Sequence, residues 1–401
     1  MEETEYISAR SSTNMSRPHD GQRTFFPFGN PFCIILPKGS YLSLKFRELQ
    51  FSFEKNLADK LKKLKPKDNA DVLTLSWMRL AIEFLSEAYN SLKTLINELQ
   101  LPVSDWDEKW IDIYLDSSVK LLDICIALSS ELSRLNQGQI LLQYVVHLMD
   151  ISTSHPSPEQ LKKSHLHLHE WIEHINSKSF KLESCPVIES LRGTLGLPKV
   201  KSSKGTVLMR ALYGVKVMTV FICGVFSVML SGCSKPLIDL HISSEDFFWF
   251  EAFCDLQAAV NEEIRRQFDS GKVVIFKEIA AVEACATGLC NLTISGSCEK
   301  EPMQDSIGIN HEEEMIAPRK STDLERQMLQ EYAINLVNGA NSLGHELDSV
   351  SKQVNDFFEI VLMGRDALLC NLRISAAPSL GFADTRMLRV TMNRSPSKQA
   401  I

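Results

Sequence analysis

The segment Val217–Ser234 constrains the fold more than any other part of this chain, because it carries eighteen consecutive uncharged residues. Its first fourteen residues, up to Leu230, are strongly apolar. A helix that crosses a membrane needs about twenty such residues, and Lys216 stands directly before the run. Two interpretations stay open: a central helix buried in a bundle, or a membrane span. The residues that would form either one are Val217, Met218, Val220, Phe221, Ile222, Val225, Phe226 and Leu230.

The charges that flank this segment differ in sign. Basic residues such as Lys204 and Arg210 precede it, and acidic residues such as Asp239 and Glu245 follow it. If the segment spans a membrane, this asymmetry places the N-terminal half of the chain on the cytosolic side.

Composition narrows the class of protein. Apolar residues make up 44% of the 401 residues and charged residues 23%, which is typical of a folded globular chain. The net charge of −7 argues against a nucleic-acid partner, since such proteins usually carry a basic excess. The ten cysteines form no C-x-x-C pair, so neither a structural zinc site nor a redox couple is indicated. We therefore expect reduced thiols in an intracellular protein.

Apolar residues recur at steps of three and four along most of the chain, which predicts amphipathic helices. Ser157 followed by Pro158 is typical of a helix start. The helices predicted from these apolar stripes cover Phe46–Leu64, Leu73–Leu99, Trp106–Leu132, a separate segment after Gly138, Leu161–Ile175 and Phe250–Phe268. Alternating apolar runs joined by hairpin turns are missing from the sequence. We therefore predict an all-α fold, a multi-helix bundle of long amphipathic helices with one central apolar helix.

Proline, glycine and runs of charge divide the chain into six predicted parts. They are a mostly disordered leader with a Phe/Pro motif (1–40), an N-terminal helical region (41–182), a hinge with the central apolar helix and the helices that follow it (183–290), an acidic disordered loop (291–320), a long C-terminal helix with a heptad seam (321–373) and a disordered tail (374–401).

The C-terminal helix carries the most regular pattern in the sequence. Apolar residues alternate steps of four and three from Leu329 to Val361, which is a heptad seam. Gly339 and Gly344 would weaken an isolated coiled coil. We therefore expect the seam to pack inside the bundle, with coiled-coil pairing to a partner protein as the alternative. The candidate interaction seam comprises Leu336, Leu343, Leu347, Val350, Val354 and Phe357.

Four histidines within ten residues are the best candidates for metal ligands: His165, His167, His169 and His174. The motif H-E-x-x-H almost begins at His169, but Glu173 occupies the place of the second histidine. His174 lies five residues from His169, about 140° around a helix, so the two cannot converge on one ion. Phosphate-binding loops and nucleophile elbows are also missing from the sequence. We predict no catalytic residues, no cofactor and no metal, and hence a protein that is not an enzyme.

Three stretches of the chain resemble the plant BYPASS family. They are Met15–Phe32 (MSRPHDGQRTFFPFGNPF), Leu101–Gln139, which contains the blocks W-D-E-K-W and L-N-Q-G, and Val337–Arg373. The likeness covers residues 15–373, and residues 1–14 and 374–401 depart from the family pattern.

The resemblance implies a plant developmental regulator that restrains the production or export of a root-derived mobile signal, which otherwise arrests shoot growth. It supplies no catalytic residues. It also implies association with a membrane of the ER or plastid, and a soluble cytoplasmic protein is the other possibility. We expect action through partner proteins bound at helical surfaces, with any small-molecule ligand unknown. The alternatives are a trafficking or tethering adaptor, and a carrier or enzyme for a small apolar metabolite, which requires an apolar cavity near Met218–Leu230.

Overall fold

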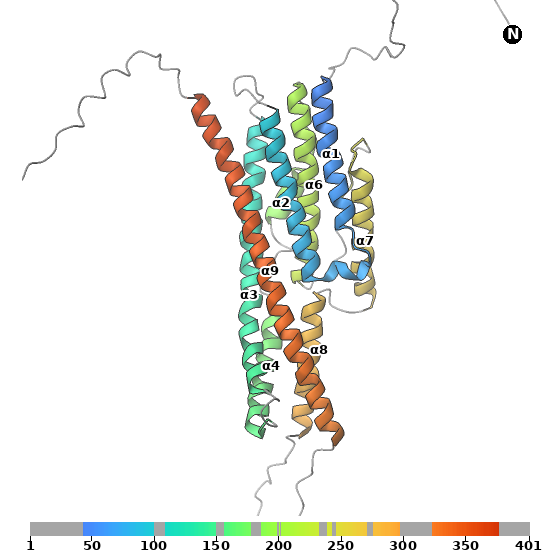
Figure 1. The fold of residues 1–401 in the computed structure, drawn as a ribbon, viewed down its shortest axis with the longest axis vertical. Helices are drawn as coiled ribbons and strands as arrows, with labels where there is room; N and C mark the ends of the chain where they lie inside the picture. The colour runs from blue at the N-terminus through green and yellow to red at the C-terminus, as the bar shows by residue number, and fades with distance from the viewer. Residues whose placement is uncertain are drawn as a thin grey trace, which may run out of the picture. The chain divides into compact units, whose positions relative to one another are not determined.

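The computed structural model describes residues 43–99, 109–149, 156–177, 186–198, 200, 202–231, 239–242, 246–270, 276–296 and 323–376. The predicted leader, most of the predicted acidic loop and most of the predicted tail lie outside these residues. Every regular element in the described part of the chain is a helix (Figure 1). The predicted all-α fold is therefore confirmed.

The starts of α1, α2 and α4 carry capping side chains that the sequence offers. Thr74 accepts the backbone N–H of Trp77 at 3.1 Å, and Ser157 forms a reciprocal capping box with Gln160, as expected at the Ser157 start. The elements are α1 (Leu44–Leu64), η1 (Asn69–Leu73), α2 (Leu75–Glu98), α3 (Lys109–Leu148), α4 (Pro158–Asn176), α5 (Pro186–Gly193), α6 (Ser203–Ser231), α7 (Phe250–Asp269), α8 (Lys277–Gly296) and α9 (Asp323–Ala376).

The apolar segment up to Ser231 lies in α6, which is packed against α1, α2, α3 and α5. Figure 1 shows α6 running beside α1 and α2. All residues from Ala211 to Met229 are buried. A helix that is apolar on every side is stable in water only when other helices cover it all round, and here the helices of the same chain do so.

The longest helix, α9, packs against α2, α3 and α8 (Figure 1). Its first half lies on α8, where Gly339 approaches Val282. Its second half lies on α2, where the ring of Phe357 meets the edge of Tyr89 at a centroid distance of 5.6 Å. One uninterrupted helix thus packs against α8 with its first half and against α2 with its second half.

The prediction of a separate helix after Gly138 is wrong, because α3 runs without a break from Lys109 to Leu148. Gly138 allows the close approach of α4 instead. A Cβ atom at this position would lie 3.0 Å from the His174 ring and 3.3 Å from the Trp171 ring. Trp171 is fully buried, so the glycine makes room for a core side chain.

Candidate interaction site

The six seam residues of α9 all lie in the interior of the bundle. Each of Leu336, Leu343, Leu347, Val350, Val354 and Phe357 is buried in the main hydrophobic core. The helices that cover them are α2, α3 and α8. In this fold the seam is already occupied, and binding of a partner to it would require the bundle to open.

The eight candidate residues of the apolar helix lie in the same core. Seven are buried and Leu230 is partly buried. Phe226 meets the edge of Trp77 at 6.3 Å, and Phe221 meets the edge of Phe253 at 5.3 Å. Among the described residues, α6 is the one helix long and apolar enough to cross a membrane. A core helix of a soluble bundle has the same composition, and burial against aromatic neighbours fits that description.

The four histidines lie along α4 and contact different partners. His167 pairs with Glu170 at 3.0 Å, and the imidazole of His174 contacts the backbone carbonyl of Arg134 at 2.8 Å. The described chain contains no group of three His, Cys, Asp or Glu side chains that could hold a metal ion. His174 instead joins α4 to α3.

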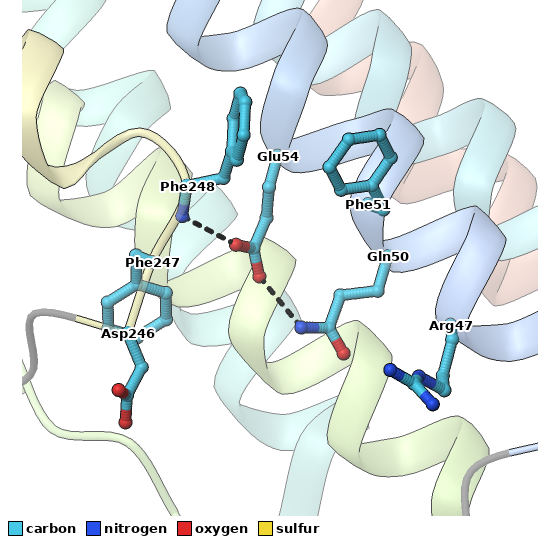
Figure 2. Close-up of a pocket in the computed structure, with 7 residues that line it drawn as sticks. All are labelled: Arg47, Gln50, Phe51, Glu54, Asp246, Phe247 and Phe248. Atoms are coloured by element: carbon cyan, nitrogen blue, oxygen red, sulfur yellow. Dashed lines mark hydrogen bonds between the residues drawn. The ribbon is translucent and has the colours of Figure 1, made fainter. Parts of the chain in front are cut away.

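The surface offers a different site, a pocket between α1 and the turn before α7 (Figure 2). Its volume is about 450 Å³. Phe51 and Phe248 form an edge-to-face pair across it, with ring centroids 5.2 Å apart. These side chains are 54% and 49% exposed. The residues that line the pocket are Arg47, Gln50, Phe51, Glu54, Asp246, Phe247 and Phe248.

A buried ion pair holds the two sides of this pocket together. Glu54 is only 3% exposed, and its carboxylate accepts hydrogen bonds from Arg210 Nε at 2.9 Å and from the Phe248 backbone N–H at 3.0 Å. Gln50 donates a third bond at 3.0 Å (Figure 2). The fork-shaped guanidinium of Arg210 also donates to the Asp246 carbonyl at 3.1 Å. A carboxylate with this many donors satisfies the conditions for burying a charge.

Arg210 further fixes the turn by covering an aromatic ring. Its guanidinium lies 4.3 Å from the centre of the Phe247 ring, a cation–π contact that is stronger away from water. Phe247 in turn stacks on the fully buried Trp249 at 4.9 Å. The exposed ring of Phe248 is therefore carried by a turn that is anchored on both sides.

Two charged side chains besides the buried Glu54 line the pocket, Arg47 on α1 and Asp246 on the turn before α7 (Figure 2). A ligand is thus favoured when it places a negative charge at Arg47 and away from Asp246. Periodicity along α1 pointed to Leu49 and Phe53 as inward-facing residues and left Phe51 unremarked. The one sequence feature that could have indicated an exposed aromatic residue here is the place of Phe51 between two core positions.

Comparison with known proteins identifies the family. The family model described as "Protein ROH1-like" matches residues 43–178. The chain is 44% identical to UPF0496 protein 4 of Oryza sativa subsp. japonica, over 91% of this chain and 98% of the relative. It is 44% identical to Protein BPS1, chloroplastic, of Arabidopsis thaliana, over 91% of this chain and 95% of that relative. No solved structure matches.

The name of the Arabidopsis relative places that protein in the chloroplast, and none of these names describes an enzyme. The resemblance noted in the three sequence stretches extends over nine-tenths of the chain at this level of identity. The chain therefore belongs to the BYPASS family of plant developmental regulators.

Proposed function

We propose that this protein restrains the production or export of a root-derived mobile signal that arrests shoot growth, and that it does so without catalysis, by binding a partner protein at the Phe51–Phe248 pocket. The extended similarity to Protein BPS1 supports a plant developmental role, and the family resemblance suggests the link to the mobile signal. The observation that supports the mechanism is the pair of half-exposed phenylalanines held on a buried ion pair.

The aromatic pair has the properties of an interaction hot spot. Hot spots of protein interfaces are aromatic and arginine side chains around a pocket that becomes desolvated on binding. Burying the exposed part of one phenylalanine contributes on the order of 1 kcal/mol. The Glu54–Arg210 pair keeps both rings in place before binding, so little conformational entropy is lost when a partner arrives.

The partner we propose is a protein segment with an apolar anchor side chain next to an acidic residue. The anchor packs on the exposed side of the Phe51–Phe248 pair, and the carboxylate pairs with Arg47. A bidentate arginine–carboxylate contact at the rim sets the orientation of the segment. The buried seam of α9 takes no part in this contact.

Complementation of a plant that lacks the endogenous protein tests this function. The double variant Phe51→Ser, Phe248→Ser is compared with the control Ile140→Ser, which removes a 70% exposed apolar side chain from α3. We expect the control to restore shoot growth and the double variant to leave shoots arrested at equal protein abundance. Normal shoots from the double variant would overturn the proposed mechanism.

A second readout separates folding from binding. We expect affinity capture from the complemented plants to recover a partner protein with Ile140→Ser. The same partner should be absent from the capture with the double variant. Identical recoveries from the two variants, each with the helical circular dichroism of the wild type, would contradict a role for the aromatic pocket.

A further inference from the structure

Lys216 is the one basic residue within the buried stretch of α6 from Ala211 to Met229. It is only 5% exposed, and its Nζ donates to the Thr194 carbonyl at 3.0 Å and to the Thr194 hydroxyl at 2.9 Å. An ammonium group has three N–H donors. Among the described residues, the third N–H of Lys216 has no acceptor. No carboxylate of these residues lies within 4.0 Å of Nζ.

The charge at this position is therefore incompletely compensated. Asp116 lies nearby on α3, but its carboxylate pairs with Lys120 at 2.7 Å. The pKa of Lys216 is lowered to about 8, and burial is the main cause. The charge of Lys120 also lowers this pKa, and the charge of Asp116 raises it. Buried charges in proteins are paired or bound to ligands as a rule, so this ammonium group is suited to bind an anion.

Lys216 forms part of the wall of a pocket of about 360 Å³. This volume lies within the range of about 300–1,000 Å³ that is typical of small-molecule sites. Asp116, Thr194 and Lys216 are its polar groups. The apolar walls are formed by Ile113, Leu197, Pro198, Met209, Leu212 and Tyr213.

We propose that this pocket binds a small molecule that consists of an apolar body and one carboxylate, with the carboxylate on Lys216 Nζ and the body against Leu212 and Tyr213. The third ammonium donor and the uncompensated charge select an anion. The carboxylate of Asp116 lines the same pocket and is paired with Lys120. Its remaining repulsion grows with the charge of the ligand, so a monoanion is preferred to a phosphate. This site is separate from the Phe51–Phe248 pocket and does not depend on the function proposed for it.

Calorimetric titration of the purified full-length chain tests the site with decanoate, decanol and decylamine as probes. The three share one apolar tail and differ only in the head group. A hydrogen bond to a charged group contributes about 1.5–3 kcal/mol, so we expect decanoate to bind at least about tenfold more tightly than decanol. Decylamine should bind more weakly than decanol.

The variant Lys216→Met removes the charge and keeps a chain of similar length. It should bind decanoate and decanol equally, while the control Lys55→Met, which removes an exposed lysine on α1, should keep the preference for decanoate. Equal binding of decanoate and decanol to the wild type, or no binding of decanoate, would overturn the proposal without any variant. A decanoate preference that survives in folded Lys216→Met would overturn it as well.

Discussion

At the scale of single residues, two of the buried charges in the bundle, Glu54 and Lys216, are compensated very differently. The Glu54 carboxylate receives three donors, including Arg210. Among the described residues, the Lys216 ammonium donates only to the two oxygens of Thr194. Removing one partner from a paired buried charge and removing an uncompensated buried charge should change stability in opposite directions.

Replacing Glu54 by leucine should lower the free energy of unfolding by about 3–5 kcal/mol, because Arg210 would stay buried without its partner. Urea denaturation followed by circular dichroism measures the change. The double variant Glu54→Leu, Arg210→Met should recover part of the loss. Glu87→Leu, which breaks the more exposed Lys60–Glu87 pair, is the control and should cost less than about 1 kcal/mol. Equal losses for Glu54→Leu and Glu87→Leu would contradict the burial of the pair.

Lys216→Met should stabilise the chain in the absence of ligand, and by more at about pH 7 than at about pH 10. The folded pKa of Lys216 is about 8 and its ordinary value is 10.5. Between these values the unfolded chain binds the proton more tightly, so the wild type gains stability as pH rises through this window. The charged groups that face the amine are Asp116 and Lys120 on α3, and burial raises the pKa of Tyr213, which keeps that hydroxyl protonated.

Urea denaturation of both proteins across this pH range checks the sign. The stability difference between Lys216→Met and the wild type should shrink steadily as pH increases. A difference that stays constant or grows would mean that the Lys216 ammonium is not penalised by burial.

At the scale of elements, helix contacts depend on small residues at defined positions. Gly288 on α8 lies under the Tyr332 ring of α9, where a Cβ atom would lie 2.7 Å from the ring carbon that carries the hydroxyl. Gly193 at the end of α5 has no atom within 4 Å of such a Cβ. The same substitution should therefore have different effects at the two sites.

Gly288→Ala should lower the free energy of unfolding by about 1–3 kcal/mol, because the Tyr332 ring has to move out of its contact. Gly193→Ala should be neutral or slightly stabilising, since alanine restricts the unfolded chain. Thermal unfolding of the two variants gives the comparison. Adding Tyr332→Ala to Gly288→Ala should reduce the penalty of the glycine substitution, and a penalty unchanged by removal of the ring would show that the contact is not its cause.

Much of this element structure was predictable from local patterns. The stripe of α1, the Ser157 start of α4 and the heptad spacing of α9 depend on residues three or four apart, so periodicity was sufficient. The continuity of α3 was not predictable, because Gly138 makes room for Trp171 on another helix. Glycine discourages helix in isolation, and only the tertiary contact explains its place here.

The candidate site was not predictable for a similar reason. Phe51 and Phe248 are far apart in the sequence, and they meet where Glu54 on α1 accepts the Phe248 backbone N–H of the turn before α7. Lys216 was visible as a charge beside an apolar run, yet its neighbour Thr194 comes from the segment after α5. Pairings over such distances leave no periodic signal in one sequence.

At the scale of the whole molecule, the main question is whether α6 is the core helix of a bundle or a membrane span. Its composition would suit a membrane span, but the structure surrounds it with α1, α2, α3 and α5 and buries every residue from Ala211 to Met229. We therefore predict that α6 stays inside the bundle, and that contact with a membrane involves the outer surface of the fold.

Alkaline carbonate extraction of membranes from plant tissue tests this most directly, because it releases proteins that do not span the bilayer. We expect the native chain in the supernatant, together with a peripheral marker protein, since α6 is the core of the bundle. Retention in the pellet with an integral marker protein would contradict the buried position of α6.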